Sequence, residues 1–186
     1  PGVTTISADL HKFGYTAKGA SVILSRNEDI YRHQIFEFGP PRRPKGWYMT
    51  PTQAGTRPGG AIASAWAVMQ YLGQDGYLRL VDGTMRYIKR FQEGINAIDG
   101  LFVLGNPAMS VFDYTSTILD IYAVAAGMED RGWIVSRASY PFKSIHFMES
   151  PGHEPYVDAY LRDLEDVVRL VFDGGTIAHG PEATYT

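Results

Sequence analysis

The chain has 186 residues, of which 45% are apolar and none is cysteine, and its formal net charge is −3. This composition can supply a folded core, and the length suits one domain or one and a half. The weak acidity argues against nucleic acid as the main partner. The lack of cysteine excludes a disulfide framework and thiolate metal sites, and is typical of a cytoplasmic protein.

Two apolar, β-branched runs at the start of the chain flank a turn that contains glycine. Residues 3–6 and 21–24 predict strands, and residues 7–19 predict the turn between them. A lysine just past the end of a buried strand lies where open α/β sheets keep their chemistry. Once burial removes its proton, such a lysine can attack a carbonyl group, whereas most lysines in turns are solvated charges. Position alone leaves both interpretations of Lys12 open.

Residues 30–46 contain several prolines and predict a long irregular loop. Loops of this length inside a compact domain are usually functional or disordered. The side chains of Arg42, Arg43 and Lys45 are therefore either solvated charges or contacts for a substrate that carries phosphate.

A second Pro/Gly-rich turn, residues 50–60, opens a predicted helix that Thr56 can cap and that continues to Gly73. The small side chains of this helix indicate close packing against a neighbour. A helix N-terminus offers unpaired backbone N–H groups to an anion. The turn is thus either a phosphate loop or a plain helix start.

The rest of the chain alternates helices and strands, which predicts a smaller α/β domain. Helices are predicted at residues 77–95, 118–128 and 155–172, strands at residues 101–104, 109–114, 133–135 and 144–148, and a loose tail after residue 173. No apolar run is long enough to span a bilayer, and no segment resembles a signal peptide.

Four ordered blocks of the sequence resemble one enzyme family. The blocks are Ser7–Gly19, Pro51–Gly60, Phe102–Pro107 and Ser144–Phe147. They resemble the pyridoxal 5′-phosphate (PLP) enzymes grouped with the group II decarboxylases, and most closely the sphingosine-1-phosphate lyases. That family has a His-Lys pair followed by Gly-Tyr and a second Lys-Gly, as this chain has in its first block. Leu10 and Ala17 depart from the threonine and proline that eukaryotic lyases tend to show.

The resemblance implies an α/β fold, as the C-terminal part of a fold-type I PLP enzyme. Residues 1–73 would be the end of the PLP-binding large domain, with the cofactor lysine and the phosphate loop, and residues 74–186 the small C-terminal domain. In this family the partner of the pyridine nitrogen and the ring-stacking aromatic lie upstream of the lysine. We therefore expect a missing N-terminal half, and a homodimer that shares its active site. Eukaryotic lyases carry a membrane anchor near the N-terminus, and this sequence shows none.

The same resemblance assigns roles to individual residues. Lys12 is the candidate for the Schiff-base lysine of the cofactor, and Lys18 and Tyr15 are candidate acid/base groups. The candidate contacts of the cofactor phosphate are His11 and, from the paired subunit, Gly55, Thr56 and Arg57. The implied reaction is retro-aldol cleavage of a phosphorylated long-chain base to a fatty aldehyde and phosphoethanolamine.

Other aromatic and histidine residues are less informative. Tyr48 either lines the pocket or is a packed aromatic, and His146 stands in an apolar strand as expected of a core residue. His33, His153 and His179 are isolated and lack the spacing of a metal site.

Two alternatives stay open. The same cofactor could support an amino-acid decarboxylase, although the second Lys-Gly pair favours the lyase. A different alternative is a non-catalytic fragment that serves dimerisation. The substrate's chain length is not readable from the sequence.

Overall fold

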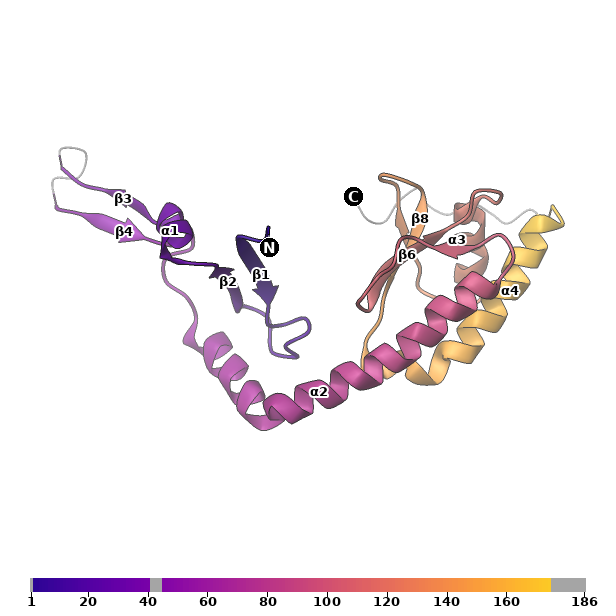
Figure 1. Ribbon diagram of the computed structural model, residues 1–186, viewed down its shortest axis with the longest axis horizontal. Coiled ribbons are helices and arrows are strands. Elements are labelled where there is room, and N and C mark those ends of the chain that lie inside the picture. The colour runs from indigo at the N-terminus through magenta and orange to yellow at the C-terminus, as the bar shows by residue number, and fades with distance from the viewer. Residues whose placement is uncertain (1, 41–44, 175–186) are drawn as a thin grey trace. The chain divides into compact units, whose positions relative to one another are not determined.

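The computed structural model describes residues 2–40 and 45–174 (Figure 1). The chain divides into two compact units, Pro1–Gly76 and Tyr77–Thr186. The predicted roles of residues 1–73 and 74–186 as parts of a large and a small domain stay predictions. The predicted tail after residue 173 lies almost wholly outside the described residues.

The first unit begins with an antiparallel pair of strands, β1 (Thr5–Asp9) and β2 (Ser21–Ser25). Both predicted strands are confirmed, and β1 runs three residues further along the chain than the pattern indicates. Apolar side chains of this pair, such as Ile6 and Leu24, are exposed in the chain by itself.

The prediction of an irregular loop at residues 30–46 is wrong in the part that the structure describes. Helix α1 (Glu28–Tyr31) begins at Asn27, whose side chain accepts the Ile30 N–H at 3.0 Å, and the short helix η1 (Arg32–Gln34) follows. Strand β3 (Phe36–Phe38) then pairs with β4 (Tyr48–Thr50). Elements of three or four residues are too short to show a period in the sequence. Arg42 and Arg43 lie outside the described residues.

The long helix α2 (Gly59–Ala97) contains one non-helical residue, Gly73, with φ 57° and ψ −177°. This conformation is left-handed in φ and suits glycine. The sequence predicts a helix that ends at Gly73 and another from Tyr77, and both helical segments are confirmed. The helix begins at Gly59, three residues after the predicted cap Thr56.

The second unit is a layer of helices on a four-stranded antiparallel sheet of order β5-β6-β8-β7. Its strands are β5 (Phe102–Val103), β6 (Val111–Thr115), β7 (Ser136–Ala138) and β8 (Ser144–Met148), and its helices besides the C-terminal part of α2 are α3 (Ile121–Glu129), η2 (Pro151–Tyr156) and α4 (Val157–Phe172). The predicted strand at residues 133–135 is wrong, because pairing with β8 begins only at Ser136.

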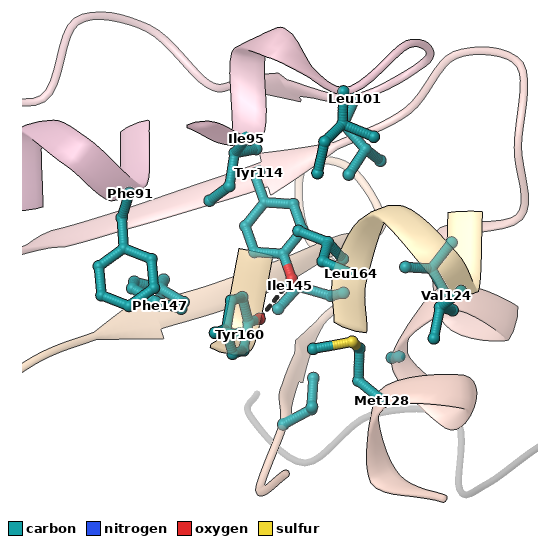
Figure 2. Close-up of a cluster of buried hydrophobic side chains, with 14 of the residues drawn as sticks. Phe91, Ile95, Leu101, Tyr114, Val124, Met128, Ile145, Phe147, Tyr160 and Leu164 are labelled. Atoms are coloured by element: carbon teal, nitrogen blue, oxygen red, sulfur yellow. Dashed lines mark hydrogen bonds between the residues drawn. The ribbon is translucent and has the colours of Figure 1, made fainter. Parts of the chain in front are cut away.

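One face of this sheet forms the core of the second unit (Figure 2). Phe112 and Phe147 are partners in the register of β6 and β8, both are buried, and the Phe147 ring contacts the rings of Phe112 and of Phe91 of α2. The hydroxyl groups of Tyr114 and Tyr160 meet at 2.6 Å inside the core. Burial raises the pKa of both phenols, so each stays protonated and can donate.

Two further contacts fix the layers of the second unit. An added Cβ at Gly94 would lie 2.4 Å from Leu161 Cδ1, so any side chain at residue 94 would force the Leu161 side chain of α4 to move. Arg137 of β7 is fully buried and donates to both oxygens of Glu129 at 2.6 and 2.7 Å, which joins the edge strand to the end of α3.

Replacement of Leu164 by alanine tests the core. Leu164 of α4 is fully buried, so Leu164→Ala should lower the free energy of unfolding of the second unit by about 2–5 kcal/mol in denaturant titrations. Leu170→Ala on the same helix is the matched control, because Leu170 is exposed, and it should change the value by less than about 0.5 kcal/mol. Equal effects of the two variants would contradict the assigned core.

Candidate active site

The backbone of Lys12 is fixed from both sides. Its N–H donates to Asp9 O at 3.0 Å, and its carbonyl accepts the Tyr15 N–H at 3.0 Å. The Thr16 N–H closes the turn on Leu10 O at 3.2 Å. The turn therefore presents Lys12 at the end of β1 from a defined backbone position.

Two residues of the turn have backbone requirements that the sequence pattern alone does not show. An added Cβ at Gly14 would lie 2.4 Å from Leu10 O, so only glycine fits there. Tyr15 has a left-handed φ of 57°, which is uncommon for a residue with a side chain. Strained backbone of this kind is concentrated at functional sites.

The amine of Lys12 lies beside a carboxylate. Its Nζ is 2.9 Å from Asp9 Oδ2, and the lysine side chain is 63% exposed in this chain. The Ser21 hydroxyl donates to Asp9 Oδ1 at 2.5 Å. Ser21 first, and then Lys12, lowers the pKa of Asp9, so Asp9 is held as an anion next to the lysine.

The other sequence-predicted residues of the turn lie around Lys12. His11 is half-buried, and its Nδ1 is buried without a hydrogen-bond partner among the described residues. Tyr15 and Lys18 are exposed. An added Cβ at Gly19 would lie 3.2 Å from Ala61 Cβ, so the end of the turn packs on the first turn of α2.

The predicted phosphate loop, Gly55–Arg57, is exposed and lies beside a cavity of about 900 Å³ in the first unit. Arg57 and Tyr48 line this cavity together with Thr5 and Ile23 of the β1–β2 pair. His11, Lys12 and Lys18 are not among its lining residues. Within one chain, Lys12 therefore does not line the cavity that Arg57 lines.

The residues of the turn and the loop fit a phosphate-bearing cofactor. The unsatisfied Nδ1 of His11 is a polar atom that an anion could satisfy. Gly55 has a φ of 58°, and a Cβ added there would meet no atom within 4 Å, so there is open space beside this residue. Among the described residues, no group of three acidic, histidine or cysteine side chains could hold a metal ion.

Sequence reasoning missed Asp9 as the partner of Lys12, and Ser21 as the partner of Asp9. Asp9 stands three residues before Lys12, a spacing that places the two side chains together in a turn, and this is the signal that could have found it. The prediction that His146 is a core residue is wrong: between the buried Ile145 and Phe147 it is only half-buried, and its Nδ1 lies 2.7 Å from Asp113 Oδ1.

Comparison with known proteins gives the class of the fold. No established family profile matches the chain. A glutamate decarboxylase of Lactobacillus brevis has a TM-score of 0.69 at 14% identity and covers 96% of this chain, which is 42% of its own. A cysteine desulfurase of Escherichia coli has a TM-score of 0.67 at 10% identity. The fold is that of part of a fold-type I PLP-dependent enzyme, as the sequence predicts.

Relatives of higher identity are sphingosine-1-phosphate lyases. The sphingosine-1-phosphate lyase of Burkholderia pseudomallei has a TM-score of 0.81 at 36% identity, over 91% of this chain and 38% of its own. The sphingosine-1-phosphate lyase of Arabidopsis thaliana is 42% identical over 91% of this chain and 31% of its own length. The chain spans about a third of these curated relatives and matches their C-terminal portion. Over nine tenths or more of its length the chain is therefore similar to the C-terminal portion of sphingosine-1-phosphate lyases.

The Ser21–Asp9 contact can be tested by titration. Ser21→Ala should raise the pKa of Asp9, measured by NMR of the carboxyl carbon, because the hydroxyl is the main group that stabilises the anion. Ser25→Ala, at the other end of β2, should leave it unchanged. Since the folded-state pKa is lowered, the contact stabilises the fold above the usual Asp range and is lost as the pH falls through the folded value. An unchanged Asp9 pKa in Ser21→Ala would show that this contact is absent in solution.

Proposed function

We propose that this chain is the C-terminal part of a PLP-dependent lyase that cleaves a phosphorylated long-chain base into a fatty aldehyde and phosphoethanolamine. The observation that carries the proposal is its identity of 36–42% to sphingosine-1-phosphate lyases of bacterial and plant origin over nine tenths or more of the chain. The whole enzyme would need a further segment, because the chain spans about a third of these relatives.

In this proposal, Lys12 Nζ attaches the cofactor covalently, and His11 contacts its phosphate. PLP, when bound, accepts the electrons released when a bond to the substrate's α-carbon breaks. Lys18 or Tyr15 takes the proton of the hydroxyl on the carbon next to the α-carbon. The carbon that bears this hydroxyl then becomes the aldehyde carbon. The fixed backbone and the unsatisfied imidazole nitrogen support these roles.

We propose that the loop Gly55–Arg57 binds the cofactor phosphate of a second subunit in a homodimer. Arg57 suits this role because its guanidinium can make two parallel bonds to phosphate oxygens. Support comes from the cavity that Arg57 lines, since Lys12 is not among its lining residues.

The amine of Lys12 has to be neutral to react, and exposure beside a carboxylate favours its charged form. The required desolvation therefore has to come from polypeptide outside residues 1–186 or from the second subunit. We accordingly expect the chain alone to bind PLP weakly and to show no turnover.

The setting of the proposed enzyme is cytoplasmic, in line with the lack of cysteine. None of the described helices is long and apolar enough to cross a membrane.

An amino-acid decarboxylase is the second candidate. An L-aspartate/L-glutamate decarboxylase of Pyrococcus horikoshii is 30% identical over 90% of this chain and 42% of its own length. The lower identity, and the second Lys-Gly pair at Lys18-Gly19, favour the lyase.

A chimera tests the proposal. Residues 1–186 would replace the matching segment of the Burkholderia pseudomallei lyase, and release of phosphoethanolamine from sphingosine-1-phosphate would be measured against release of carbon dioxide from glutamate and aspartate. We expect the chimera to cleave the phosphorylated base and neither amino acid. Lys12→Ala should lower the rate of this cleavage at least about a thousandfold, because nucleophilic and electronic catalysis both depend on that amine.

Lys89→Ala is the matched control, because Lys89 is an exposed lysine of α2 and should leave turnover unchanged. Circular dichroism of every variant separates loss of activity from loss of fold. Turnover of amino acids in place of the phosphorylated base would favour the decarboxylase, and a folded chimera active without Lys12 would refute the lyase proposal.

A further inference from the structure

The second unit contains a cavity that the proposed lyase site does not use. Its volume is about 540 Å³, within the range of small-molecule sites. The cavity lies between β8, η2, α4 and the segment before β7, and its walls include five aromatic side chains: Phe91, Trp133, Phe147, Tyr156 and Tyr160. We call it the Glu149 pocket, after the carboxyl group in its wall.

Glu149 occupies a position where the fold calls for an apolar side chain. Ile145 and Phe147 alternate along β8 toward the core, and Glu149 is the next residue of that row. Its side chain is only 14% exposed. The backbone carbonyl of Ser110 accepts the Glu149 N–H at 3.2 Å. The buried hydroxyl group of Ser110 has no hydrogen-bond partner among the described residues.

The nearest basic group to Glu149 is the imidazole of His153, and its Nδ1 does not supply a proton to the carboxylate. His153 Nδ1 contacts Glu149 Oε2, and the same nitrogen accepts the Ser150 N–H at 3.1 Å. A nitrogen that accepts a hydrogen bond carries no proton, so in this arrangement the shared proton is on the carboxyl group. Ionisation of Glu149 therefore calls for a cation from elsewhere.

The walls of the pocket supply no such cation. No lysine or arginine is among the lining residues. The titratable groups that line the pocket with Glu149 are His153 and Tyr156 of η2, Tyr160 of α4 and His146 of β8, whose Nδ1 is 2.7 Å from Asp113 Oδ1. Tyr160 is held by Tyr114 and stays protonated.

We propose that the Glu149 pocket binds a small organic ammonium ion. The ammonium group lies against the Glu149 carboxylate, and the hydrocarbon part lies against the aromatic walls. Aromatic faces attract cations as well as alkyl groups, and a buried carboxylate supplies the charge that selects an amine over an alcohol.

Binding depends on pH in a defined direction. Burial raises the pKa of Glu149 to about 7, so the carboxyl group is mostly neutral at pH 6 and mostly ionised at pH 8. Affinity for an ammonium ion therefore rises about tenfold from pH 6 to pH 8, in proportion to the ionised fraction.

The probe is n-hexylammonium chloride, with 1-hexanol as its neutral counterpart. Trp133 lines the pocket. In the 1–186 chain that carries Trp47→Phe and Trp66→Phe, Trp133 is the remaining tryptophan, so its fluorescence reports binding in the pocket. We expect saturable binding of hexylammonium at pH 8, at least about tenfold weaker binding of hexanol, and weakening of the amine's affinity at pH 6.

Glu149→Gln keeps the shape of the side chain and removes its charge, so it should abolish both the preference for the amine and the pH dependence. Glu154→Gln is the matched control, because Glu154 is exposed on the neighbouring helix and does not line the pocket. Equal affinity for hexanol and hexylammonium, or unchanged amine binding in Glu149→Gln, would overturn the proposal.

A second measurement on the unsubstituted chain covers the case in which Glu149→Gln does not fold. Hexylammonium should lower the pKa of Glu149 in carboxyl NMR, because ligand and proton compete for the same oxygens. A Glu149 pKa that does not move at saturating hexylammonium would also overturn the proposal.

Discussion

The function proposed for this chain depends on the backbone around Lys12. The Lys12 N–H donates to the Asp9 carbonyl, and the Lys12 carbonyl accepts the Tyr15 N–H. These two hydrogen bonds fix where the lysine side chain leaves the turn. Gly14 permits the close approach to Leu10, and Tyr15 adopts a left-handed conformation that few residues adopt. The chain thus supplies a lysine in a defined place, with the Asp9 carboxylate 2.9 Å from its amine. Chemistry at this lysine requires surroundings that remove water and offset that carboxylate.

The two units differ in how far they bury their apolar residues. In the second unit, three helical segments cover one sheet face, and the core closes around the Tyr114–Tyr160 pair. In the first unit, apolar side chains of β1 and β2 remain exposed. This contrast agrees with a chain that spans about a third of its relatives, because apolar strand faces are stable when another layer covers them. It also places the Glu149 pocket in the part of the chain that is packed by its own residues.

The sequence predicted the long elements well and the short ones poorly. Helical spacing from Leu80 to Phe91 and the apolar alternation of residues 144–148 correspond to buried faces, so both were predictable. Strands β3 and β7 have three residues each, and their position depends on pairing with β4 and β8, which leaves no local period. The lysine turn was found through a family resemblance. Its partner Asp9 and the buried carboxyl of Glu149 depend on three-dimensional placement, although each stands at a spacing that could have indicated it.

The most direct test of the account is to find where PLP attaches. The chimera of residues 1–186 with the remaining part of the Burkholderia pseudomallei lyase would be incubated with PLP, reduced with borohydride, digested and analysed by mass spectrometry. The account predicts a phosphopyridoxyl group on the peptide that contains Lys12, and only weak labelling when residues 1–186 are treated alone. A folded chimera that is labelled on another lysine, or on none, would contradict it.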